Sequence, residues 1–108
     1  MSRDFHLEVV ERLEIARRAL SLHRGREVTK TEFCVDICGM PSPQAYGNLL
    51  NSPRTSGFHG MYAANLARNT GIPEGWVYRG DYMFAPEPIA RHIRTVLREF
   101  KKTGKIWP

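Results

Sequence analysis

Hydrophobic residues recur at intervals of three and four along most of this chain, with polar residues between them. This spacing is typical of amphipathic helices, and it predicts an all-α fold. The predicted helices cover residues 4–22, 29–37, 42–51, 61–70, 73–79 and 88–102. Their apolar faces would carry Phe5, Val9, Leu13, Ala16 and Leu20, then Phe33 and Ile37, then Tyr46, Leu49 and Leu50, then Ala63, Leu66 and Ala67, then Trp76 and Val77, and finally Ile89, Ile93, Val96, Leu97 and Phe100. The opposite face of the first helix carries Glu8, Glu11, Arg12, Arg18 and their neighbours.

Capping residues mark the ends of the second and third predicted helices. Thr29 and Glu32 have the spacing of a capping box, in which each side chain binds the backbone N–H of the other residue. Gly39 suits the left-handed position just beyond a helix end. Ser42 would cap the next helix, with Pro43 at its first position, where the missing N–H of proline costs nothing. Two short helices joined by a turn that contains glycine are the plan of a helix-turn-helix DNA reader.

The length and charge of the chain fit a small protein with an anionic partner. Its 108 residues suit a single domain, and its net charge of +5 favours nucleic acid or an acidic surface. The basic excess lies in residues 23–30 and after residue 82. No apolar run approaches the roughly 20 residues needed to cross a bilayer, so we expect no membrane association. Residues 1–6 lack the apolar region of a secretory signal.

The two cysteines, Cys34 and Cys38, lie four residues apart on one predicted helix. Their fixed spacing disfavours a disulfide, and free thiols suit a reducing, cytoplasmic compartment. They would form half of a zinc site at most, and His23 and His59 stand at no recognisable spacing from them. We therefore expect the thiols to pack in the core, with no metal and no cofactor. No catalytic motif orders the histidines, cysteines and carboxylates, so we do not expect an enzyme.

The order and spacing of these segments resemble the lambda-repressor-like, Xre-type helix-turn-helix domains of bacteria and their phages. Residues 29–37 resemble the first motif helix of that family, Gly39-Met40 its turn, and residues 42–51 its recognition helix. Residues 65–73 and 76–81 resemble its closing helices. The resemblance implies a compact five-helix DNA-binding domain over residues 4–81. Residues 82–108 would add a C-terminal amphipathic basic helix, followed by a loose tail over 104–108.

Two departures from the family pattern affect the expected DNA contacts. The turn over residues 38–43 is about one residue longer than usual and contains two prolines, so the register of the recognition helix is open. That helix also lacks Arg and Lys. Its base-reading side chains would be Gln44 and Asn48, one turn apart, with Asn51 near the end. Side-chain amides of this kind can bond bidentately to adenine; the alternative is that they are merely solvated.

Contacts to the DNA backbone would come from basic and hydroxyl groups beside the recognition helix. Ser42 and the first N–H groups of that helix could hold a phosphate. The further candidates are Lys30, Arg54 and Thr55, then Arg24 and Arg26, each with a solvated surface role as the alternative. A second basic stripe, Arg91, Arg94, Arg98 and Lys101 with Lys105, would either follow the DNA backbone or form the wet face of the last helix.

These features together predict a bacterial or phage transcriptional regulator that binds double-stranded DNA. A homodimer is expected as well, because a twofold axis would place two recognition helices about one DNA turn apart, and the last helix has an apolar stripe to form it. The alternative is a protein-interaction module, an adaptor or antitoxin-like partner on the same scaffold. It would bind its partner through the 46–51 face or the apolar C-terminal stripe. The uncharged recognition helix favours this alternative.

Overall fold

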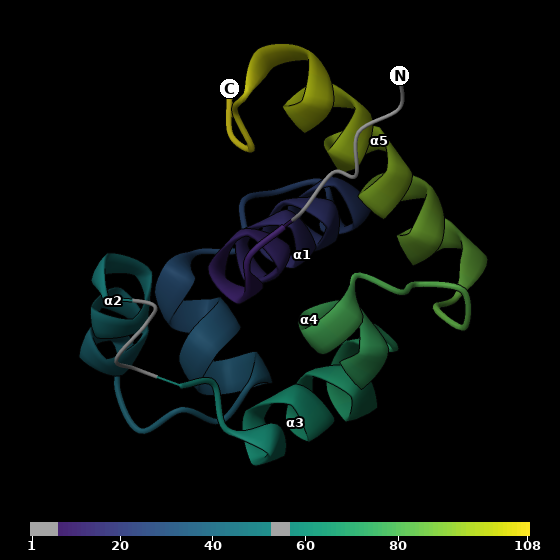
Figure 1. Ribbon diagram of the computed structural model, residues 1–108. Coiled ribbons are helices and arrows are strands. Elements are labelled where there is room, and N and C mark those ends of the chain that lie inside the picture. The colour runs from purple at the N-terminus through teal and green to yellow at the C-terminus, as the bar shows by residue number, and fades with distance from the viewer. Residues whose placement is uncertain (1–6, 53–56) are drawn as a thin grey trace.

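Six helices form all the regular secondary structure in the part of the chain that the computed structural model describes, residues 7–52 and 57–108 (Figure 1). The all-α class predicted from the sequence is therefore confirmed. The helices are α1 (Val9–Arg24), η1 (Glu32–Ile37), α2 (Pro43–Asn51), α3 (Gly60–Thr70), α4 (Glu74–Arg79) and α5 (Glu87–Thr103). No helix within the described residues is both long enough and apolar enough to span a membrane.

Helix α1 is central, with η1 and α2 on one side and α5 on the other (Figure 1). Leu13, Ala16 and Leu20 are buried along it, as their spacing predicts. The predicted start at residue 4 is wrong, because Glu8 is extended and its N–H donates a 2.9 Å hydrogen bond to the Glu11 carboxylate. This capping box begins the helix at Val9. Phe5, which extended the predicted stripe, lies outside the described residues.

The second helix is a π-helix rather than an α-helix. The Cys38 N–H bonds to the Phe33 carbonyl, five residues back, at 3.0 Å, which is the spacing of the wider π turn. Only one half of the predicted capping box forms. The Thr29 hydroxyl accepts a hydrogen bond from the Glu32 N–H at 3.1 Å. The Glu32 carboxylate does not return the bond to Thr29, because it accepts hydrogen bonds from Arg24 and Arg26. The apolar face is nevertheless as predicted.

Helix α3 closes the end of η1. The side-chain amide of Asn65 donates a 2.9 Å bond to the Cys38 carbonyl, and that of Asn69 a 2.8 Å bond to the Ile37 carbonyl. Carbonyls at a helix end have no partner within the helix, so these two amides satisfy groups that would otherwise need water. Between η1 and α2, Gly39 turns the chain with a φ of +75°, as its position predicts.

Helices α4 and α5 complete the core around α1. Trp76 of α4 is fully buried, as expected, and its indole N–H donates a 2.8 Å bond to the Arg12 carbonyl. The Arg12 guanidinium returns a 3.0 Å bond to the Val77 carbonyl, so Arg12 is not a purely solvated residue of the outer face. The apolar stripe of α5 packs on α1: Ile89, Ile93 and Val96 are buried and Leu97 and Phe100 are half-buried.

The segment after α5 is not loose, contrary to expectation. Gly104 ends the helix with a φ of +74°, and the chain then turns back toward α1 (Figure 1). The Trp107 indole N–H donates a 2.9 Å bond to the Glu14 carboxylate, and the Ile106 carbonyl accepts a 2.9 Å bond from Arg18. Two partners on α1 therefore fix this segment.

Candidate nucleic-acid interface

Helix α2 presents a row of side-chain amides to solvent. Ser42 caps it by accepting the Ala45 N–H at 3.3 Å, and Pro43 occupies the first turn, both as predicted. Gln44, Asn48 and Asn51 are all exposed, at spacings of four and three that align them on one face of the helix. The three residues expected to read bases thus share one accessible surface.

The opposite side of α2 is anchored in the protein. Tyr46 is fully buried and Leu49 nearly so. The Tyr46 ring lies 5.8 Å from that of Phe33 in η1, centroid to centroid, and its hydroxyl donates a 2.6 Å bond to the Glu14 carboxylate of α1. Burial raises the pKa of Tyr46 above its usual range, and the neighbouring Glu14 carboxylate adds to that effect, so the phenol stays a hydrogen-bond donor.

Glu14 is the centre of a buried polar network that the sequence analysis did not find. Arg17 donates two bonds to its carboxylate, from Nε at 3.1 Å and from Nη2 at 2.8 Å, and Trp107 and Tyr46 donate one each. Burial by itself would raise the pKa of Glu14. The hydrogen bonds from Arg17 and Tyr46, with the charge of Arg17 and the bond from Trp107, outweigh it and lower the pKa. The carboxylate is therefore ionised at neutral pH.

Among the basic residues near η1, Arg24 and Arg26 form ion pairs within the protein. Lys30 is exposed at the start of the helical segment that leads into η1. Arg24 and Arg26 instead converge on the Glu32 carboxylate, each at 2.9 Å. The hydrogen bond from Arg26 holds the pKa of Glu32 below its usual value, and the charges of Arg26 and Arg24 add to this effect, although desolvation of the carboxylate acts in the opposite direction. Arg54 and Thr55 lie outside the described residues.

The second basic stripe belongs to a different side of the molecule. Arg91, Arg94, Arg98 and Lys101 are all exposed along α5, and Arg94 pairs with Glu87 at 2.6 Å. Helices α2 and α5 lie on opposite sides of α1 (Figure 1). The candidate stripe and the candidate base-reading residues therefore belong to helices on different sides of α1.

Both cysteines pack in the core as expected. Cys34 and Cys38 are free thiols with no exposed surface. Burial, with a smaller effect of Cys34, raises the pKa of Cys38 to about 12, which keeps that thiol protonated. The described residues contain no group of three or more His, Cys, Asp or Glu side chains placed to hold a metal ion.

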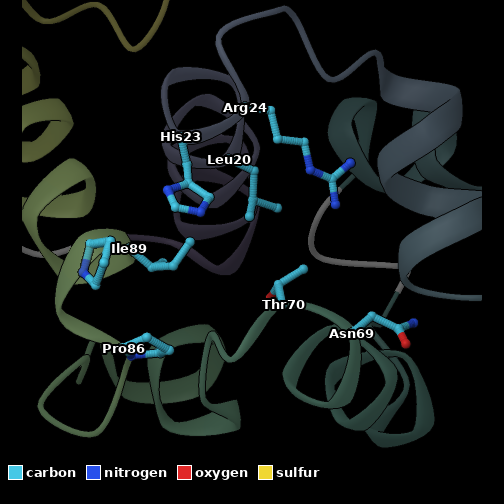
Figure 2. Close-up of a pocket in the computed structure, with 8 residues that line it drawn as sticks. Leu20, His23, Arg24, Asn69, Thr70, Pro86 and Ile89 are labelled. Carbon is cyan, nitrogen blue, oxygen red and sulfur yellow. The ribbon is translucent and has the colours of Figure 1, made fainter.

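A cavity of about 470 Å³ lies between α1, α3 and the start of α5 (Figure 2). Its polar side chains already serve the fold: Arg24 binds Glu32, Asn69 binds the Ile37 carbonyl, and Thr70 donates to the Leu66 carbonyl. The remaining lining is His23, Leu20, Pro86, Pro88 and Ile89. The cavity therefore offers a ligand few uncommitted polar groups.

Comparisons of this chain with protein-family models, with curated proteins and with solved structures give no match.

Proposed function

We propose that this chain is a sequence-specific double-stranded DNA-binding protein, a bacterial or phage transcriptional regulator of the lambda-repressor-like helix-turn-helix class. The observation that carries the proposal is the surface of α2. Three exposed amides, Gln44, Asn48 and Asn51, line one face of a short helix whose other face is fixed by Tyr46 and Leu49. A rigid helix with a row of hydrogen-bonding side chains is the element that reads the major groove.

The chemistry of the amides suits adenine. A glutamine or asparagine side chain offers one donor and one acceptor, which match N7 and the N6 amino group of adenine in the major groove. Each such bidentate pair contributes roughly 1–3 kcal/mol of discrimination against the wrong base. Gln44 and Asn48 stand one turn apart and would contact neighbouring base pairs, with Asn51 at the far end of the helix.

Phosphate contacts in this proposal come from Lys30 and from the N-terminal end of α2. Lys30 is exposed. At the start of α2, Pro43 has no N–H and the Ala45 N–H already bonds to the Ser42 hydroxyl, so the backbone donor nearest the helix start is the N–H of Gln44, at the positive end of the helix dipole. Arg54 and Thr55 are candidates by sequence position. Such contacts fix register and supply the salt-dependent part of the affinity. In this proposal the chain acts without a cofactor and is not an enzyme.

The test is selection of bound sequences from a random pool of duplex DNA, followed by affinity measurements at two salt concentrations. An enriched motif with A·T base pairs at the contacted positions would support the proposal. Gln44→Ala should then weaken binding to the selected site and relax its sequence preference. Thr95→Ala, on α5, is the matched neutral control and should leave both unchanged. Salt-sensitive binding without any enriched motif would contradict base reading.

A homodimer is part of the proposal, but it would need a surface other than the apolar stripe of α5. That stripe is already covered by α1 within the same chain. The most exposed large apolar side chains of the described residues are Met83 and Phe84, in the connection before α5. Light scattering of the wild type and of the double variant Met83→Ser, Phe84→Ser would show whether these residues mediate self-association.

The second candidate function is a protein-interaction module on the same scaffold. It is favoured by the absence of a basic residue on α2 and by the pairing of Arg24 and Arg26 with Glu32, which together lower the positive charge beside α2. Because Tyr46 is buried and the α5 stripe packs on α1, the partner would contact the Gln44–Asn51 face. No enrichment and no DNA affinity at low salt would favour this candidate over the first.

A further inference from the structure

Helix α2 and the segment of residues 105–108 each donate a hydrogen bond to the same carboxylate, that of Glu14. The Tyr46 hydroxyl binds Oε2 of Glu14 at 2.6 Å, and the Trp107 indole N–H binds Oε1 at 2.9 Å. Glu14 belongs to α1, so its carboxylate joins three separate parts of the chain: α1, α2 and the 105–108 segment. We infer that Glu14 and Trp107 are positioning residues that fix α2, and that the 105–108 segment acts as a clasp on the DNA-reading helix.

Trp107 shields the ion pair on which this arrangement depends. The Arg17 guanidinium carbon lies 4.0 Å from the centroid of the Trp107 ring, and the Arg17 side chain is only 5% exposed. The Glu14 side chain is 13% exposed. Hydrogen bonds to a carboxylate are strong when water is excluded and weaken when water competes for the same oxygens. Releasing Trp107 would therefore hydrate Glu14 and weaken its bond to Tyr46.

A weaker bond between Glu14 and Tyr46 would loosen the α2 face that carries Gln44 and Asn48. The Tyr46 hydroxyl joins α2 to α1 through a side-chain hydrogen bond. Gln44 and Asn48 flank Tyr46 at two residues on either side, on the face that points away from the core. Any loosening of Tyr46 therefore allows the amides to move, and base readout needs them held in place.

Arg17 links the same carboxylate to the chain just before η1. Its Nη1 donates a 2.9 Å bond to the buried carbonyl of Val28. Arg17 thereby keeps its position when Trp107 is removed, because a third contact remains. The clasp is thus specific to α2: losing Trp107 removes a support of the Tyr46–Glu14 bond and leaves the Arg17–Val28 contact in place.

Amide hydrogen exchange of the free protein tests the clasp without DNA. Trp107→Phe keeps an aromatic ring beside Arg17 but deletes the donor to Glu14. We expect about three- to tenfold faster exchange of the protected amides of α2, and no comparable change in α3. Trp107→Leu, which also removes the ring, should give a larger effect in the same helix. Lys105→Ala, an exposed position of the same segment, is the control and should leave α2 unchanged.

A double-variant experiment tests whether Trp107 acts on α2 through the bond between Glu14 and Tyr46. In a Tyr46→Phe background, α2 no longer bonds to Glu14, so adding Trp107→Phe should change its exchange little further. Two independent effects that multiply would overturn the route through Glu14. Exchange in α2 that is unchanged by Trp107→Phe, or faster by the same factor in every helix, would overturn the clasp.

The consequence for DNA rests on the proposed function, and the two can fail separately. With a selected DNA site, Trp107→Phe should weaken specific binding by a similar factor while leaving non-specific binding unchanged. If α2 loosens in the variant but the wild type binds no DNA, the clasp stands and the proposed function falls. If the wild type reads DNA but Trp107→Phe leaves hydrogen exchange in α2 unchanged, the proposed function stands and the clasp falls.

Discussion

The side-chain amide of Asn65 donates a 2.9 Å hydrogen bond to the backbone carbonyl of Cys38, which ties α3 to the end of η1. The amide oxygen of Asn65 also accepts a bond from Arg68 of its own helix. The bond from Asn65 to Cys38 thus connects η1 and α3, the helices that precede and follow α2 in the sequence. The turn into α2 therefore depends on a residue that lies well beyond it in the chain.

Asn65→Ala is expected to destabilise the protein by about 1–2 kcal/mol, because it leaves the Cys38 carbonyl without its donor in a partly buried position. Urea unfolding followed by circular dichroism measures the change. Asn48→Ala removes a similar side chain from the exposed face of α2 and should change stability little. An Asn65→Ala variant as stable as the Asn48→Ala variant would contradict the role of this bond.

Gly39→Ala should be more damaging than the same change at Gly25. Both glycines have a left-handed backbone, with φ of +75° and +73°. A Cβ at Gly39 would lie 2.7 Å from Nδ2 of Asn65, whereas one at Gly25 would meet nothing within 4 Å. Gly25→Ala should therefore cost only the conformational penalty of roughly 1–2 kcal/mol. Gly39→Ala adds a displacement of Asn65, and equal losses of unfolding free energy would refute the close approach.

Acid should destabilise the fold in part through Glu14. Its pKa in the folded protein lies below its ordinary value of 4.5, so the unfolded chain binds the proton more readily. The stabilisation is complete above that ordinary value and is lost as the pH falls through the folded pKa. Glu14→Gln should lower stability at neutral pH and flatten the profile as the pH falls below the ordinary value and through the folded pKa of Glu14.

The matched control for the acid effect is Glu32→Gln. The pKa of Glu32 is also lowered, but its partners Arg24 and Arg26 are much more exposed than Arg17, so water screens the pairs. We expect a smaller flattening of the stability profile for this variant. A Glu14→Gln profile as steep as that of the wild type would show that Glu14 does not carry the acid sensitivity.

Glu32→Gln also tests whether Arg24 and Arg26 can contribute to DNA binding. It releases Arg24 and Arg26 from their carboxylate, so affinity for all DNA sequences should rise and depend more steeply on salt. Lys30→Ala should have the opposite effect and reduce the salt slope by about 1. Fluorescence anisotropy with a labelled duplex at several salt concentrations measures both. An unchanged salt dependence in Glu32→Gln would mean that the two arginines do not face the DNA.

Much of the helical pattern could be predicted because its signals are local. Ser42 and Pro43 start α2 through contacts within one turn, and Gly39 ends the preceding segment through its own backbone angle. The exposed positions of Gln44 and Asn48 follow from the 3.6-residue period once α2 is placed. These features need no knowledge of the rest of the chain.

The features that could not be predicted depend on contacts between distant residues. Glu14 and Trp107 are 93 positions apart, and Glu14 and Tyr46 are 32 apart. In the sequence, Glu14 is one more polar residue of the first helix, and the segment after Gly104 has no periodic pattern. Its aromatic residue, Trp107, was the available signal, since tryptophan is rarely left in solvent and its N–H needs a partner.

The π form of η1 has a consequence for how this protein tolerates changes in chain length. A turn closed between Phe33 and Cys38 holds one residue more than the α-helical turn that would join the same two ends. Removing a single residue between Glu32 and Ile37 could be absorbed by a change to α-helical bonding, with Lys30 on one side and Gly39 on the other left in place. Elsewhere in a helix the same deletion would rotate all later side chains by about 100°. We therefore expect η1 to be the element of this chain in which a one-residue deletion leaves α2 presented in the same way.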